Sequence, residues 1–217
     1  MQDSYTQNMI NDLLQIIILF VLPVALLYFG IIPIKYRMLA LCSVMVLILS
    51  VVAEERWTLK DLGISIDGIS QAMIAYTIFT VIGIYAISAF AKFLNRKPPN
   101  ISWKNEYFPI LLVHIAISVL QEFGFRGFLM LKLEAIFISP TIVILVNALL
   151  FSFSHIIYPN KKVVLSATFV GGLGFAGIYY LFPNLILVSV SHVILNFFFI
   201  LRYQFLSPQK VERLASE

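Results

Sequence analysis

The feature that most constrains the fold is a series of long apolar runs separated by short polar segments. The runs cover residues 13–33, 38–53, 69–94, 107–137, 140–157, 163–181 and 185–203. Most are long enough to cross a hydrocarbon core of about 30 Å as a helix. Of the 217 residues, 60% are hydrophobic and 12% are charged, and mean hydropathy is +0.94. A soluble domain of this size does not need that much apolar surface. We therefore predict an all-α, polytopic transmembrane bundle of about seven spans.

The breaks between the runs predict how the chain is divided. The clearest break, residues 92–105, contains Pro98-Pro99 and several basic residues, which do not continue a membrane helix. We predict N-terminal transmembrane helices and loops over residues 1–106, a core of helices over 107–204 and a polar tail over 205–217.

The distribution of charge predicts a membrane partner and an orientation. The formal net charge of +4 comes from basic residues placed between apolar runs, where lipid headgroups rather than nucleic acid explain them. With seven spans, Arg56, Lys60 and Lys132 fall in loops on the N-terminal side, and most other basic residues fall on the opposite side. This asymmetry predicts an outside N-terminus and an inside C-terminus. The single cysteine, Cys42, excludes an intramolecular disulfide and a cysteine metal site.

One polar stretch interrupts the fourth apolar run. Glu122 and Arg126 lie four residues apart, so on a helix they share a face and can form an ion pair. Each ionisable group costs roughly 2.5–3.5 kcal/mol in a membrane helix, which makes it a candidate functional residue. Ser118 and His114 extend the same stripe, and a polar stripe faces protein or water, not lipid. We predict a polar cavity inside the bundle and a break in the helix near Gly124 or Gly127. A purely structural ion pair is the alternative.

Two later stretches place histidines at helical spacing. His155 follows Phe151 by four residues, and His192 precedes Asn196 by four, so each pair would share a helix face. A ring nitrogen and an amide aimed at one point suit an oxyanion or a metal. Together with Glu122, these residues would make a hydrolytic constellation of bases and oxyanion donors.

The run from Gly172 to Gly177 matches the glycine spacing of a dinucleotide-binding fingerprint. It lies inside an apolar helical run, with no strand before it and no acidic residue about 20 positions on. We interpret its small residues as a site of close helix packing.

The three polar stretches together resemble the motifs of the CPBP family, the CAAX-protease and bacteriocin-processing membrane proteins, also called the Abi family. The family pattern is Glu-Glu-x-x-x-Arg, then Phe-x-x-x-His, then His-x-x-x-Asn. Here the corresponding residues are Gln121-Glu122-x-x-x-Arg126, Phe151-x-x-x-His155 and His192-x-x-x-Asn196. The resemblance extends over about residues 107–199 and implies an intramembrane endopeptidase.

The resemblance also implies a role for each residue. His155, with Glu122, would activate water, His192 and Asn196 would stabilise the oxyanion, and Arg126 would orient Glu122. Gln121 departs from the pattern, because an amide can hold a water molecule but cannot accept its proton. General-base catalysis contributes about 10²–10⁴-fold, so this departure bears directly on activity.

Several alternatives remain open at this point. No metal is required, but Glu122, His155 and His192 could together form a two-histidine, one-carboxylate zinc site. Gln121 favours a catalytically silent membrane scaffold, in bacteriocin immunity or export. A small transporter is a further reading, since buried acids and histidines also form proton relays. The substrate would be a peptide or a membrane protein, prenylated or carrying a leader peptide.

Overall fold

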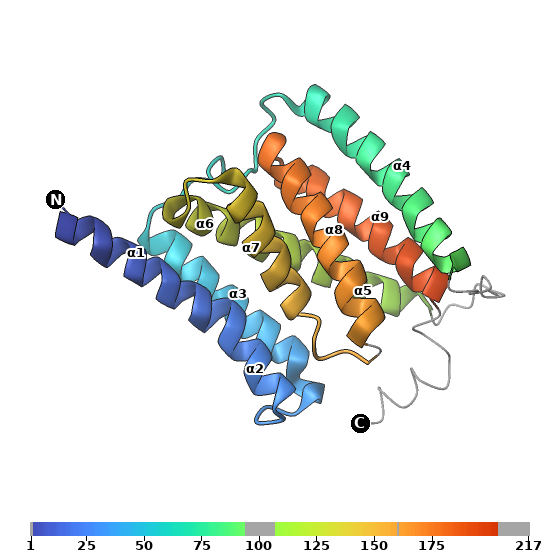
Figure 1. The fold of residues 1–217 in the computed structure, drawn as a ribbon, viewed down its shortest axis with the longest axis horizontal. Coiled ribbons are helices and arrows are strands. Elements are labelled where there is room, and N and C mark those ends of the chain that lie inside the picture. The colour runs from blue at the N-terminus through green and yellow to red at the C-terminus, as the bar shows by residue number, and fades with distance from the viewer. Residues whose placement is uncertain (1, 94–106, 160, 204–217) are drawn as a thin grey trace. The chain divides into compact units, whose positions relative to one another are not determined.

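A computed structural model describes residues 2–93, 107–159 and 161–203, with backbone only for residues 2–5, 107–111 and 200–203. Every regular element in these ranges is helical, and no strand occurs among them (Figure 1). The predicted all-α class is therefore confirmed. The predicted polar tail lies outside the described residues.

The apolar helices agree with a membrane bundle. Five helical stretches are long and apolar enough to cross a membrane, namely Thr6–Tyr28, Ile34–Glu54, Ile69–Phe93, Leu112–Ile136 and Lys161–Leu181. Two further apolar helices, Pro140–Phe153 and Leu185–Phe199, are shorter. At 1.5 Å per residue the first of these spans about 20 Å, less than a full hydrocarbon core. The chain is a multi-pass membrane protein.

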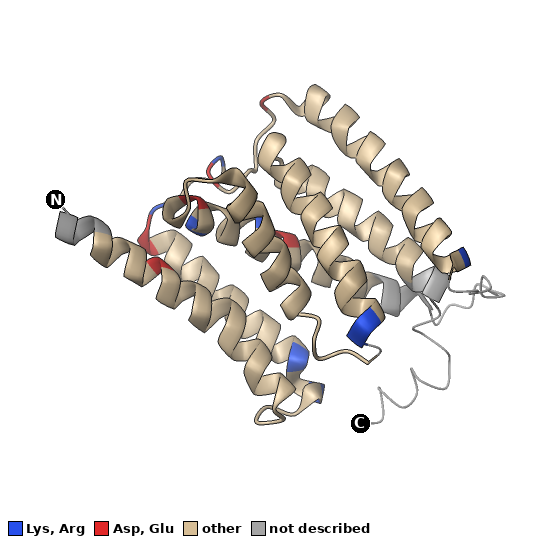
Figure 2. Ribbon diagram, in the orientation of Figure 1, with Lys and Arg blue, Asp and Glu red and all other residues tan. Residues whose placement is uncertain are grey.

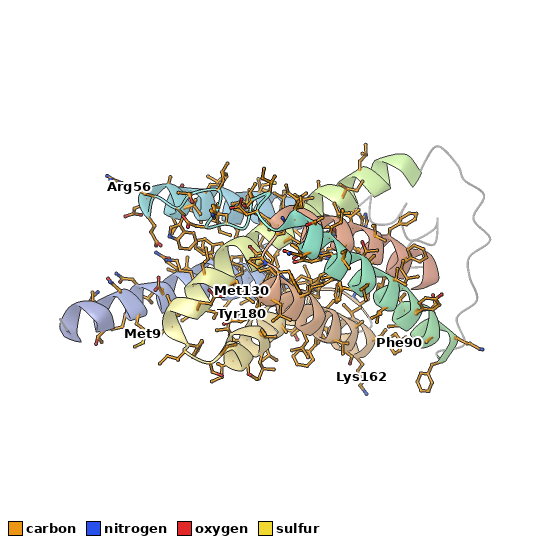
Figure 3. All side chains as sticks on the ribbon, turned by 90° about the horizontal axis from the view of Figure 1, so that it is seen from above. Met9, Arg56, Phe90, Met130, Lys162 and Tyr180 are labelled. Carbon is orange, nitrogen blue, oxygen red and sulfur yellow. The ribbon has the colours of Figure 1, made fainter. Side chains whose placement is uncertain are left out.

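The side chains follow the pattern expected for a protein surrounded by lipid. Large apolar residues are exposed on most helices, among them Leu39, Ile74 and Val170, and side chains project outward all around the bundle (Figure 3). By contrast, the side chains of Glu122 and Arg126 are fully buried, at 0% exposure. This arrangement, with apolar side chains outside and charged side chains inside, is expected in lipid. Lipid accepts apolar groups, whereas ionic groups must find partners inside the protein.

The chain forms two compact units. The first unit contains residues 1–64 and 123–183, and the second contains residues 65–122 and 184–217. The division falls between Glu122 and Phe123, inside the central motif.

The first unit holds most of the helices. In chain order they are α1 (Gln2–Ile16), η1 (Ile17–Val21), α2 (Leu22–Tyr28), η2 (Ile34–Tyr36), α3 (Arg37–Glu54), η3 (Phe123–Leu129), α6 (Met130–Ile136), α7 (Pro140–Phe153) and α8 (Lys161–Leu181). α7 and α8 pack closely as consecutive helices. A Cβ added to Gly172 would lie 3.1 Å from the Cα of Ala148, so this approach needs glycine. The packing interpretation of the glycine run is therefore confirmed at Gly172.

In the first unit the acidic residues gather toward one end, whereas basic residues occur at both ends (Figure 2). Lys132 on α6 is buried, and its Nζ lies 2.7 Å from Oδ1 of Asp12 and 2.5 Å from Oε1 of Glu55. The sequence analysis placed Lys132 in a loop, but it lies on a helix, where the two carboxylates offset the cost of burying its charge. The starts of α3 and α8, which begin with Arg37 and with Lys161-Lys162, lie toward the other end of the unit (Figure 2).

The second unit is built from α4 (Ile69–Phe93), α5 (Tyr107–Glu122) and α9 (Leu185–Tyr203), and α9 packs against both of the others. A Cβ on Gly83 of α4 would lie 2.8 Å from the side chain of Leu195, so these two helices approach closely. The Oγ1 of Thr80 donates a 2.8 Å hydrogen bond to the Oγ of Ser191. Asn184, just before α9, donates from Nδ2 to the carbonyl of Ser65, 2.9 Å away.

Candidate active site

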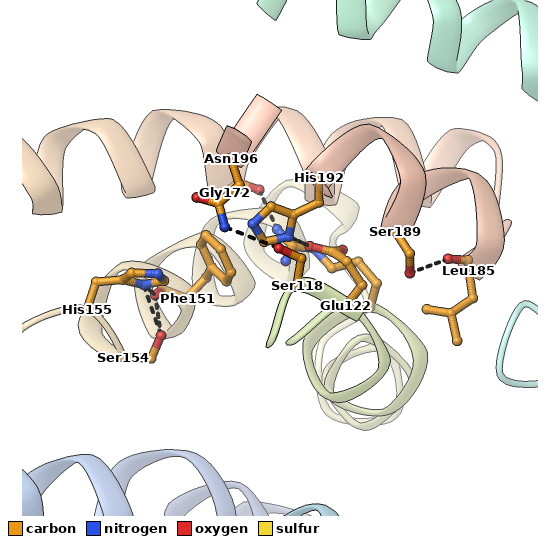
Figure 4. A network of polar contacts seen from close by, with 11 residues as sticks. Ser118, Glu122, Phe151, Ser154, His155, Gly172, Leu185, Ser189, His192 and Asn196 are labelled. Carbon is orange, nitrogen blue, oxygen red and sulfur yellow. Dashed lines mark hydrogen bonds and ion pairs between the residues drawn. The ribbon is translucent and has the colours of Figure 1, made fainter. Parts of the chain in front are cut away.

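The closest polar contact in the second unit joins Glu122 to His192 (Figure 4). Oε1 of Glu122 lies 2.5 Å from Nδ1 of His192, and the two side chains are 0% and 9% exposed. An ionised carboxylate only accepts hydrogen bonds, so Nδ1 is the donor and carries a proton. The imidazole is thereby held in one orientation.

A second polar contact between α5 and α9 lies one helical turn away from the first. Nδ2 of Asn196 donates to Oγ of Ser118 over 3.1 Å. Ser118 precedes Glu122 by four residues on α5, and Asn196 follows His192 by four on α9. The two helices therefore run antiparallel, and their polar stripes meet residue by residue. The sequence analysis placed Ser118 on the stripe but assigned it no role.

A neighbouring face of α9, about 100° around the helix, packs against α4. Thr80 and Ser191 are both buried, at 8% and 3% exposure, and their hydroxyls are hydrogen-bonded to each other. Ser191 directly precedes His192, and Leu195, which packs on Gly83, directly precedes Asn196. These contacts fix the rotation of α9, and with it the direction in which His192 and Asn196 point.

His155 lies in the first unit, just beyond the end of α7. The helix ends at Phe153, so His155 lies in the following turn and not on a shared helix face as predicted. Its Nδ1 is 2.8 Å from the carbonyl oxygen of Phe151, and its ring lies 4.9 Å from the ring of Phe151. A carbonyl oxygen only accepts hydrogen bonds, so Nδ1 is the donor in this contact.

Arg126 lies in η3, a π-helical segment at the position where the sequence predicted a break in the helix. Its guanidinium carbon lies 4.5 Å from the ring centre of Phe151 and 5.5 Å from that of Phe175. Nη2 approaches the carbonyl oxygen of Gly172 at 3.5 Å. Aromatic faces attract a cation, and the attraction grows when water is excluded.

The π-helical segment has a buried polar support that the sequence analysis missed. Asn147 on α7 donates from Nδ2 to the carbonyl oxygen of Phe125, 2.7 Å away, and it is 0% exposed. The spacing in the sequence could have indicated Asn147, because it precedes Phe151 by four residues, as Phe151 precedes His155. π-helical turns are frequent at functional sites.

The predicted site residues are thus distributed over both units. Glu122, His192 and Asn196 lie together in the second unit, while Arg126 and His155 belong to the first. The ion pair between Glu122 and Arg126, and a cavity shared by all five residues, stay predictions. Among the described residues, no three His, Cys, Asp or Glu side chains form a group that could hold a metal ion. Zinc would need both Glu122 and His192 to face the metal, whereas the two are hydrogen-bonded to each other.

Comparison with known proteins adds one finding. Residues 103–198 match the family model described as type II CAAX prenyl endopeptidase, Rce1-like. None of the curated proteins and none of the solved structures compared with the chain matches it.

Proposed function

We propose that this chain is an intramembrane endopeptidase that hydrolyses a peptide bond in or near the bilayer. The match of residues 103–198 to the family model of type II CAAX prenyl endopeptidases supports the proposal. The observation that carries the proposal is the buried pair of Glu122 and His192, with Asn196 one turn away. An acid, an imidazole and an amide on two facing helices are the groups that peptide hydrolysis needs.

His192 and Asn196 stabilise the oxyanion in this proposal. Formation of a tetrahedral intermediate places negative charge on the former carbonyl oxygen, and preorganised N–H donors lower the energy of that charge. For Nε2 of His192 to donate while Nδ1 donates to Glu122, the ring must be an imidazolium.

His155 accepts the proton of the attacking water. The water oxygen bonds to the carbonyl carbon while a proton passes to Nε2 of His155, the nitrogen left free of a proton by the bond to Phe151. When the intermediate collapses, the carbon–nitrogen bond breaks and the proton passes to the departing amine. Gln121 orients the water through its amide but takes no proton, so His155 carries the general-base role of the missing acid. Glu122 contributes negative charge that favours proton transfer to the histidine.

Arg126 acts as a positioning residue. Its guanidinium is buried between the rings of Phe151 and Phe175, which fixes its direction. In the proposed site it orients Glu122. The family match supports a peptide or prenylated protein as substrate, and a leader peptide is the other class that we propose to screen.

A catalytically silent scaffold is the second candidate, and Gln121 is the observation that favours it. Restoring the acid with Gln121→Glu separates the two candidates. Cleavage by the native chain supports the protease, whereas cleavage only by the Gln121→Glu variant assigns the native chain to the scaffold class.

The decisive experiment is a substrate screen in proteoliposomes. Native protein is compared with the His155→Gln, Asn196→Ala and Ser189→Ala variants on prenylated and leader-type peptides. Removal of the base should lower the rate about 10²–10⁴-fold, and removal of the oxyanion donor about 10²–10³-fold. Ser189 is the matched control, because it is a buried α9 serine whose hydroxyl bonds only within its helix, to the carbonyl of Leu185. Equal rates in all four proteins would contradict the assignment. Zinc found in stoichiometric amount in the purified protein would contradict the metal-free form.

A further inference from the structure

The outer surface of the α7–α8 pair carries a groove that the proposed chemistry does not use. It is a wide, open groove of about 410 Å³ and is lined by Leu149, Ser152, Phe153, Ile156, Leu165, Ser166 and Phe169.

The groove is formed by two helical stripes. On α7, Leu149, Ser152 and Phe153 stand at intervals of three and four residues, and Leu165, Ser166 and Phe169 do the same on α8. The hydroxyl of Ser152 donates to the carbonyl oxygen of Leu165 at 2.9 Å, so its hydrogen-bonding capacity is used within the pair. The walls are therefore predominantly apolar, and they suit a hydrocarbon chain.

A basic residue stands at the end of the groove. Lys162 precedes Leu165 and Ser166 by three and four residues, so it continues the α8 stripe beyond the last lining position. It is exposed, and its side chain extends outward from the start of α8 (Figure 3). From Lys162 to Phe169 the helix rises about 10 Å, so the stripe presents a cation followed by an apolar channel.

The surroundings of Lys162 favour an anion. Its neighbour Lys161 lies 4.4 Å from the ring centre of Tyr28. The start of α3, which begins at Arg37 directly after η2, lies toward the same end of the unit (Figure 2). The acidic side chains described in this unit gather toward its other end, where Asp12 and Glu55 bind Lys132 (Figure 2). A uniformly basic end of a membrane protein attracts anionic headgroups, at about 1 kcal/mol per basic residue.

We propose that this groove binds one anionic phospholipid, with an acyl chain between α7 and α8 and the headgroup phosphate on Lys162. The charge at one end and the apolar walls along the rest match the two parts of such a lipid. The assignment is independent of the proposed protease activity, because none of the groove residues belongs to the proposed catalytic set.

The test is native mass spectrometry of the full-length protein in detergent, titrated with phosphatidylglycerol or with phosphatidylcholine of the same acyl chains. Native protein should bind phosphatidylglycerol more tightly. Lys162→Gln should lower the ratio of the two affinities about fivefold. Arg56→Gln removes the same charge near the other end of the unit and should leave that ratio unchanged. Ser166→Trp fills the groove and should weaken binding of both lipids. Leu181→Trp, at an exposed position on the same helix about 18 Å beyond Phe169, should leave binding unchanged.

Thermal denaturation midpoints of all four variants, measured without added lipid, show whether each variant is folded. Equal binding of the two lipids by native protein would overturn the proposal, as would a Lys162→Gln variant that retains the full preference. Unchanged binding by the folded Ser166→Trp variant would overturn the placement of the acyl chain.

Discussion

Among the residues that the structure describes, three buried charged side chains are stabilised by three different kinds of partner. Glu122 is bonded to an imidazole, Arg126 lies between two aromatic rings, and Lys132 is bonded to two carboxylates. The differences follow from geometry. A planar guanidinium stacks on rings, whereas an ammonium group is a compact charge that several oxygens can surround.

Lys132 provides a test of stability at the residue scale. Lys132→Met should lower the free energy of unfolding by about 1–3 kcal/mol, because it leaves the carboxylates of Asp12 and Glu55 without their shared cation. The two carboxylates are 17% and 30% exposed, so water relieves part of the cost. Lys132→Arg keeps the charge and should retain most of the stability. Thermal denaturation in detergent measures both, and equal losses in the two variants would contradict the electrostatic explanation.

At the scale of elements, η3 shows how the fold positions a charged side chain. Six of its seven residues, Gly124 to Leu129, are buried. Asn147 bonds to the carbonyl of Phe125, and Gly172 allows α8 to approach α7. A π-helical turn changes the phase of the residues that follow it, so the direction of Arg126 depends on these two neighbours.

The loop between α3 and α4 is attached to α8 through Gly63. Gly63 has φ +77°, Tyr179 donates from its hydroxyl to the carbonyl of Leu62 at 3.2 Å, and a Cβ on Gly63 would overlap that hydroxyl. Gly63→Ala should cost about 2–4 kcal/mol, the sum of left-handed strain and overpacking. Gly30 is the matched control, with φ +73° and nothing within 4 Å, so Gly30→Ala should cost only about 1–2 kcal/mol. Denaturation midpoints compare the two, and equal shifts would show that the contact with Tyr179 contributes nothing.

The same loop predicts a pH dependence. Hydrogen bonds from the hydroxyl and backbone amide of Thr58 hold the pKa of the Asp61 carboxyl below its ordinary value. A lowered folded-state pKa stabilises the loop above the unfolded-state pKa of about 3.9, and the stabilisation is lost as the pH falls through the folded-state value. The protection of the loop amides, measured as hydrogen exchange relative to the intrinsic rate at each pH, should therefore be high at neutral pH and fall below about pH 4. Asp61→Asn should remove this acid-dependent loss of protection, and a variant that retains it would assign the effect to another group.

At the scale of the whole molecule, the sequence predicted the helices better than their contacts. Apolar runs mark a membrane helix directly, and the polar stripe of α5 and the spacing of His192 and Asn196 predicted facing polar surfaces. The burial of Lys132 could not be predicted, because its partners Asp12 and Glu55 lie far away in sequence. The end of α7 before His155 was also missed, because the apolar pattern continues past Phe153 while the helix does not.

Convergence of the two histidines on one peptide is the prediction on which the hydrolase assignment depends. Cys42 is the only cysteine, so a Cys42→Ser background allows thiols to be placed at chosen positions. A short bifunctional thiol reagent should link the double variant His155→Cys with His192→Cys. The matched control pairs His155→Cys with Val190→Cys, because Val190 is exposed on α9 and points about 200° away from His192. Linking of the control pair but not of the histidine pair would remove the chemical assignment and leave the helical fold intact, since the apolar spans do not depend on where the histidines meet.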